Sequence, residues 1–375
     1  MIHASRLALM IFSTLSLSSL PAFAQNERPL SINLTGIFSG YVVYHSQDNS
    51  TGNEERHIDI MREASIFTNA EGTLDNGLTV GYFLESLIDM GDSFNVSDSY
   101  IYFSNSWGRI NFGGTDGAAA LLQIAAPAAD PLFDGMEQLI NPVNHQLMLG
   151  LGAPVNVAMG YLMGQSGAED KITYLTPSFN GLQAGISYTP EMNSIASRSL
   201  GGVLADDTEE DSGSVWEGSV RYEGRFEEAT LTMGAGYSHI DLEKDVTGAG
   251  TDTFDDRRAW DLGVNVKYKG YGAGIAYVTD DNGLRDSDTD ILVIGADYTT
   301  GPWRIGASYY DREDDIENLG LGNIDIETQR YSAGVTYTAG GGLSLKGSAH
   351  HIEHDIAGSD DPDATTFVLG STLTF

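Results

Sequence analysis

Cysteine is absent from the 375 residues of this sequence, and basic residues are scarce. A secreted chain without cysteine has no disulfide framework, so a chain of this length must be held together by its own architecture. The 19 Lys and Arg stand against 53 Asp and Glu, which gives a formal net charge of −34. Nucleic acid and anionic membrane surfaces repel such a chain, so we expect no nucleic-acid partner.

Long hydrophobic runs are also missing after the N-terminus. No stretch of about 18 apolar residues follows residue 24, which excludes transmembrane helices. The N-terminus has Arg6, an apolar run over residues 7–20, and an A-x-A motif ending at Ala24, which is the order of a secretory signal. A membrane anchor is the alternative, but the run is short and rich in Ser and Thr. We predict a signal over residues 1–24 and a mature chain of residues 25–375, whose charge is −34 − 1 = −35 because Arg6 is lost.

Glycine and tyrosine are abundant, with 45 and 18 copies, and they lie in segments that alternate with period two. In residues 260–268 the side chains Trp, Leu, Val, Val and Tyr alternate with Asp, Gly, Asn and Lys. The last residues alternate in the same way and stop at Phe375. Such segments predict β-strands with one apolar face.

Aromatic residues bracket the apolar faces. Trp260 and Tyr268 are about 27 Å apart along a strand, with aliphatic residues between them. A soluble β-sandwich alternates too, but the aromatic brackets and the uncharged apolar face favour a barrel in a bilayer. The predicted aromatic girdle is Trp216, Tyr222, Trp260, Tyr268, Trp303, Tyr309, Tyr331 and Tyr337. The opposite face is small and polar, which predicts a wet lumen rather than a dry core.

Short turns alternate with long acidic connections, as in outer-membrane barrels. The fold class we predict is all-β, a transmembrane antiparallel β-barrel whose last strand closes against the first. The sixteen predicted strands are 31–45, 57–72, 77–89, 97–106, 109–116, 168–178, 181–190, 214–226, 228–242, 258–269, 271–280, 289–299, 302–313, 327–338, 342–354 and 364–375.

Three segments carry a resemblance to a known family: "SDSYIYFSNSWGRINFGGTDGAAALL", "DKITYLTPSFNGLQAGISYTP" and the terminal "FVLGSTLTF". The chain resembles the general Gram-negative porins, especially those of alphaproteobacterial type. The resemblance implies a homotrimer, a third loop folded into each pore, and export through the periplasm to the outer membrane, with its lipid and lipopolysaccharide. It also implies that Phe375 is the assembly signal read by the barrel assembly machinery.

The segment over residues 117–167 is the expected constriction loop. It contains no Lys or Arg and is too apolar to suit water outside the barrel. We expect it to pack on the inner wall and to aim Asp130, Asp134 and Glu137 at the lumen. A partly helical lid or a trimer-contact loop is the alternative.

Strand parity also gives a set of charged residues that we expect to face the lumen. Porins of this type have basic residues on the early strands, whereas Arg56 and Arg62 are all that we identify there, and the parity around Arg62 is ambiguous. The expected lumen charges are Arg62, Glu217, Arg221, Glu223, Asp261, Lys267, Arg304, Arg330 and Lys346.

The function that fits these features is passive diffusion of small hydrophilic solutes and ions, with a preference for cations because of the acidic connections. We expect no reaction, no cofactor and no metal. The alternatives are a solute-selective channel, a barrel enzyme and a surface adhesin. An enzyme needs a nucleophile, a base and an orienting group close together, and an adhesin needs no pore.

Overall fold

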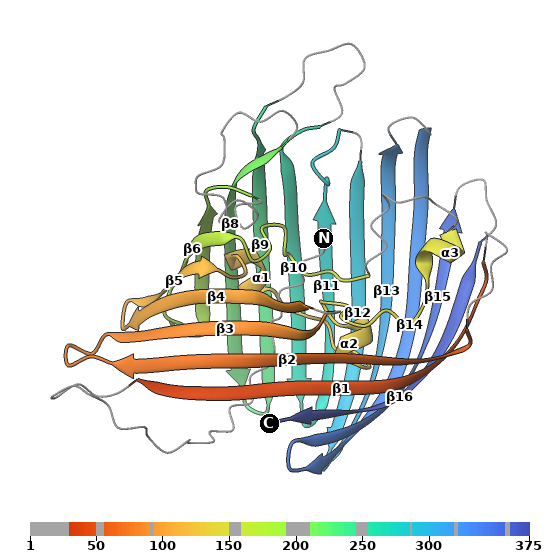
Figure 1. Cartoon of the computed structure of the whole chain (residues 1–375), viewed down its shortest axis with the longest axis horizontal. Helices are drawn as coiled ribbons and strands as arrows, with labels where there is room; N and C mark the ends of the chain where they lie inside the picture. The colour runs from red at the N-terminus through yellow and green to blue at the C-terminus, as the bar shows by residue number, and fades with distance from the viewer. Residues whose placement is uncertain are drawn as a thin grey trace.

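Sixteen antiparallel strands close into one barrel in the computed structural model (Figure 1). The structure describes residues 30–49, 56–90, 93–149, 159–192, 211–244, 254–285, 287–318, 322–356 and 361–375. Each strand pairs with its sequence neighbours, and the last strand pairs with the first. The predicted fold class, strand number and closure are confirmed. The predicted signal over residues 1–24 lies outside the described residues.

The strands lie close to their predicted ranges. The largest differences are a fourteenth strand that is seven residues longer than predicted and a sixth strand that is five residues shorter. The first eight are β1 (Ser31–Gln47), β2 (Ile58–Thr73), β3 (Thr79–Met90), β4 (Ser93–Asn105), β5 (Gly108–Gly114), β6 (Asp170–Leu175), β7 (Leu182–Thr189) and β8 (Ser212–Phe226). The other eight are β9 (Ala229–Leu242), β10 (Arg257–Tyr268), β11 (Tyr271–Asp280), β12 (Asp288–Thr300), β13 (Trp303–Asn318), β14 (Gly322–Gly340), β15 (Leu343–Ile356) and β16 (Asp363–Thr374).

Three short helices lie between β5 and β6: α1 (Ala118–Leu122), α2 (Pro131–Asp134) and α3 (His145–Leu149). Among the described residues, no helix combines the length and the apolar character needed to cross a membrane. The residues 117–167 that contain these helices are called the inner loop below.

The two ends of the barrel differ in their connections. Short turns join β2 to β3, β4 to β5 and every later even strand to the next strand, and we call that side the turn end. Left-handed residues make these turns tight, as at Lys269 (φ 47°) and Gly270 (φ 87°). The inner loop and most of the long connections leave from the opposite side, the loop end.

The outward face is apolar along most strands, as the alternation predicted. On β10 the outward residues from Trp260 to Tyr268 are all exposed, whereas the intervening Ala259 and Asp261 are buried. Trp216, Trp260, Tyr268, Trp303 and Tyr331 of the expected girdle are exposed on this face. The register places Tyr222, Tyr309 and Tyr337 on the same face, where they are half-buried.

The half of the inward face of β10–β16 nearer the loop end is a dry core, which corrects the prediction of a polar lumen wall throughout. Inward Val278, Val293 and Ile352 are at most 4% exposed. They share one hydrophobic cluster with Met159 and Met163 of the inner loop. The inner loop supplies the apolar partners that the wall alone lacks, because it folds back inside the barrel (Figure 1).

Candidate functional site: the inner loop and the wall around it

The inner loop begins on the wall formed by β6–β9. Helix α1 contacts all four of these strands, and three of its alanines are completely buried. The backbone N–H of Ala118 donates to Ser187 Oγ on β7 at 2.6 Å. The predicted folding of this segment into the barrel is therefore confirmed.

A row of inward glycines lets the next part of the loop lie flat on the wall. This glycine track consists of Gly263, Gly274, Gly295, Gly306 and Gly334 on the consecutive strands β10–β14. A Cβ on Gly263 would stand 2.5 Å from the carbonyl oxygen of Ile124, and one on Gly306 would stand 2.6 Å from that of Ala128. A Cβ on Gly295 would collide with the carbonyl oxygen of Pro127. Any larger residue would have to push the loop away from the wall.

Asp134 anchors α2 from within the loop. Its carboxylate accepts the backbone N–H groups of Ala129 at 2.7 Å and Asp130 at 2.8 Å. It also accepts the hydroxyl of Ser308 on β13 at 2.5 Å. Asp134 is 1% exposed, so its charge is used to hold the loop in shape and against the wall.

Asp130 links the same turn to two other strands. It accepts the Tyr41 hydroxyl of β1 at 3.1 Å and forms an ion pair of 3.0 Å with Lys346 of β15. Its other role is the N-cap of α2, where it accepts the N–H of Leu132. Asp130 is 2% exposed. The expected aim at the lumen is thus corrected for Asp130 and Asp134, because both carboxylates satisfy donors of the loop and the wall. Glu137 is half-buried.

A histidine pair fastens α3 near the loop end. His145 Nδ1 lies 3.0 Å from His354 Nε2 on β15, and His354 Nδ1 lies 2.8 Å from Thr328 Oγ1 on β14. Both imidazoles are buried. Burial, then the neighbouring His354 and the cationic Arg330 and Arg312, lowers the pKa of His145 to about 3.

Acidification is expected to loosen this contact. A histidine whose pKa falls from 6.5 when free to about 3 when docked binds more protons in the undocked state between these values. The docked loop therefore keeps its full stability above about pH 6.5 and loses it progressively as the pH falls towards 3. We expect more frequent closures in single-channel recordings at pH 4 than at pH 7. In H145Q this pH dependence should be weaker, and an unchanged dependence in H145Q would remove His145 as its source.

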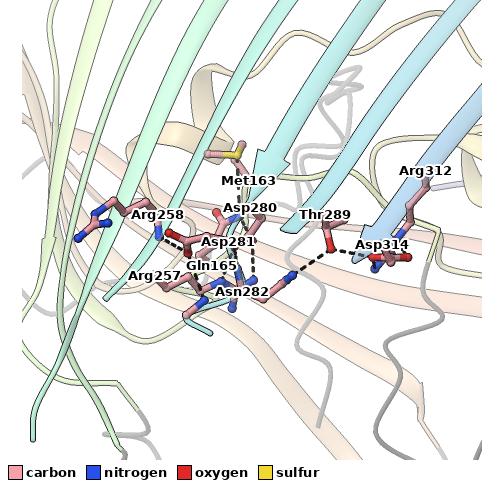
Figure 2. Close-up of polar contacts among 11 residues, drawn as sticks. Met163, Gln165, Arg257, Arg258, Asp280, Asp281, Asn282, Thr289, Arg312 and Asp314 are labelled. Carbon is pink, nitrogen blue, oxygen red and sulfur yellow. Dashed lines mark hydrogen bonds and ion pairs between the residues drawn. The ribbon is translucent and has the colours of Figure 1, made fainter. Parts of the chain in front are cut away.

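The last part of the inner loop is tied to a polar network at the loop end of β10–β13 (Figure 2). Gln165 donates to Asp280 Oδ2 at 3.1 Å, and Arg257 binds the same carboxylate through both oxygens at 2.8 and 2.6 Å. Figure 2 also shows Thr289 joining Asn282 to Asp314. The network holds the loop end of these strands and the inner loop together.

Lys171 on β6 holds the two ends of the inner loop together. Its ammonium donates to the carbonyl oxygen of Thr115 before the loop. It also donates to the carbonyl oxygens of Gly167, the last residue of the loop, at 2.6 Å and of Glu169 after it at 2.9 Å. Lys171 is 2% exposed. Sequence reasoning missed this residue, because its partners are backbone atoms and leave no pattern of side chains.

The remaining charged residues divide between the two faces of the wall. The register puts Glu217, Arg221, Glu223, Asp261, Lys267, Arg304, Arg330 and Lys346 on the inward face. Arg62 is the exception, and its expected lumen position is wrong. It lies opposite Gly40 on the face that carries exposed Ile60 and Val42. Successive side chains of a strand point to opposite faces, so an error of one residue in the alternation puts a side chain on the wrong face.

Arg109 is an inward cation that we did not identify from the sequence. Its guanidinium carbon lies 3.8 Å from the centre of the Tyr102 ring, and its Nε donates to Asn111 at 2.7 Å. Arg109 and Asn111 alternate with the apolar Ile110 and Phe112. This alternation predicts that Arg109 faces the lumen, so the residue could have been identified from the sequence. Inward Phe83 and Tyr100 continue the aromatic surface next to Tyr102.

The family model of the Gram-negative porins matches residues 8–357. The chain belongs to the Gram-negative porin family. No curated protein sequence matches it significantly.

Several solved porin structures have the same fold at low sequence identity. The anion-selective porin from Comamonas acidovorans gives a TM-score of 0.61 at 17% identity, covering 92% of this porin and all of that chain. The outer membrane channel DcaP of Acinetobacter baumannii gives 0.59 at 12%, covering 95% of this porin and all of that chain. The trimer form of OmpT of Vibrio cholerae gives a TM-score of 0.58 at 13% identity, covering 93% of this porin and all of that chain.

Proposed function

We propose that this porin is a passive diffusion channel for small hydrophilic solutes and ions, and that it catalyses no reaction. The observation that carries the proposal is the inner loop, anchored to the wall at α1, along the glycine track, at α2 and at α3. A segment held so firmly inside a closed barrel narrows the lumen without a moving part. Family membership supports an outer-membrane diffusion channel.

We also propose that cations permeate preferentially. The chain carries a large acidic excess, and much of it lies in connections such as Glu209, Glu210 and Asp211. Mouth charges concentrate counterions within a screening length, which is about 10 Å at 0.1 M salt and about 3 Å at 1 M. Glu137 is the inner-loop acid that we assign to the constriction, since Asp130 and Asp134 hold the loop in place.

Assembly and export are further parts of the proposal. We propose a homotrimer in outer-membrane lipid and lipopolysaccharide, because the OmpT structure of Vibrio cholerae has a trimer form. The signal over residues 1–24 would direct export through the periplasm, and the assembly machinery would recognise Phe375. Each of these proposals rests on the family rather than on a contact in this chain.

Planar-bilayer recording tests the channel and its selectivity together. We expect stable ohmic steps at 1 M salt, and a reversal potential across a salt gradient that has the sign of cation preference and is larger at low salt. E137Q should reduce the preference that survives at high salt. E353Q, which neutralises an exposed acid on the outward face of β15, is the matched control.

The outcomes separate the rival functions. A barrel that never conducts points to an adhesin, and currents blocked by one class of solute point to a solute-selective channel. Anion preference, or equal effects of E137Q and E353Q, contradicts the assignment of Glu137.

A further inference from the structure

Six of the ten inward basic residues on the described strands gather at the turn end. Each lies within five residues of the end of its strand next to a short turn. They are Arg109, Arg221, Arg225, Lys267, Arg304 and Lys346. The inward acids on the same part of the described wall are fewer, namely Glu71, Glu223 and Asp297.

The inward acids gather at the loop end. Each of them lies within five residues of the end of its strand away from the short turns, and they are Asp59, Glu63, Glu85, Asp98, Glu217, Asp261, Asp280 and Asp314. The basic residues on that part of the described wall are Arg257, which is bound to Asp280, and Lys171, which is bound to backbone carbonyl oxygens. Arg312 and Arg330 lie deeper: Arg312 is bound to Asp314, and Arg330 donates to the carbonyl oxygen of Phe133. Asp59 is exposed and the other seven acids are at most 8% exposed, so most of this negative charge acts on the lumen from within the wall. The acids still outnumber the basic residues at the loop end, whereas the basic residues outnumber the acids at the turn end, so the two parts of the wall carry opposite net charge.

Pairing leaves the basic part with spare charge. Arg221 pairs with Glu223 at 3.3 Å and Arg304 with Asp297 at 2.8 Å. Glu71 accepts the hydroxyl of Tyr102. In the described part of the chain, no ion pair is formed by Arg109, Arg225 or Lys267. Arg109 is held over Tyr102, so its charge is fixed in place.

We propose that Arg109, Arg225 and Lys267 form a second charge filter, opposite in sign to the acidic filter at the loop end and in series with it. The inference rests on the proposed channel function. The acidic part enriches cations and the basic part enriches anions. When the loop end is positive, both kinds of ion are driven towards the junction and accumulate there. The opposite voltage drives both away and depletes the junction, so the channel rectifies current.

Single-channel currents at equal and opposite voltages test the proposal. At 0.1 M salt, where the screening length is about 10 Å, we expect currents that differ about 1.5-fold or more, and at 1 M, where it is about 3 Å, no difference. The larger current should flow when the loop end is positive. Because the chain has no cysteine, D75C in the β2–β3 turn marks the turn end for a membrane-impermeant thiol reagent and fixes the orientation.

Two variants locate the basic filter. R109Q/R225Q/K267Q should abolish the rectification and raise the preference for cations. R225Q/K267Q leaves the stacked Arg109 intact and should reduce the rectification at least twofold. R258Q/R285Q removes two positive charges near the loop end and should keep it. Linear currents at 0.1 M in a channel that conducts at 1 M overturn the second filter and leave the channel standing. Rectification that survives in the triple variant overturns it as well.

Discussion

Replacing Gly295 by valine is expected to push the inner loop off the wall and to narrow the pore. A Cβ at this position collides with the carbonyl oxygen of Pro127, which is main chain and has no rotamer to change. The loop lies between the wall and the lumen, so it is displaced towards the lumen. We expect single-channel conductance at 1 M salt to fall about twofold or more, because permeation depends steeply on pore diameter.

Gly218→Val is the matched control for this variant. Gly218 lies on the outward face of β8, and the nearest atom to its added Cβ would be 4.0 Å away. This variant should fold and conduct like the parent. If G295V and G218V have the same conductance as the parent, the loop does not rest on the glycine track.

Deletion of Phe375 is expected to lower the amount of assembled barrel about 30-fold, since two backbone hydrogen bonds of about 1 kcal/mol each are lost. The N–H of Phe375 donates to the carbonyl of Gly36 at 3.0 Å, and the N–H of Gly36 donates back at 2.7 Å. The ring of Phe375 covers Gly36, where a Cβ would stand 2.5 Å from the ring. The yield is measured as the heat-modifiable fraction in outer-membrane extracts.

Gly36→Val separates closure of the barrel from recognition of its terminus. It displaces the ring of Phe375 but leaves the terminal residue in the chain. A loss in both variants assigns the effect to closure, and a loss in the deletion alone assigns it to recognition by the assembly machinery. Full assembly without Phe375 would refute both roles.

The strands could be predicted because alternation is a pattern of neighbouring residues, and the position of the inner loop could be predicted from its apolar composition. The wall residues that bind the loop could not be predicted from the sequence. Asp130 binds Tyr41, which is 89 residues away, and Lys346, which is 216 residues away. Nothing in the sequence near Asp130 distinguishes a carboxylate that docks from one that lines a pore. The composition suggested the second role.

The faces of single residues were predictable only where alternation was unambiguous. The polar side chains around Arg62 allowed either parity, and only pairing with β1 determines its face. The dry core could not be predicted either, because it too depends on residues distant in the sequence. Val278 and Ile352 look like ordinary members of short strands, and their burial depends on methionines more than 100 residues away in the chain.

The contacts of Lys171 with both ends of the inner loop affect which changes of loop length this porin can tolerate. Pairing of β5 with β6 and the Lys171 contacts bring both ends of the inner loop together at one neck. Once a neck is closed, doubling the length of the segment beyond it costs only about 0.6 kcal/mol of closure entropy. Insertions beyond the neck that keep the contacts of the loop with the wall therefore cost the barrel little stability. The bore of the channel can be resized by changing one segment, while the strands that hold it in the membrane stay the same.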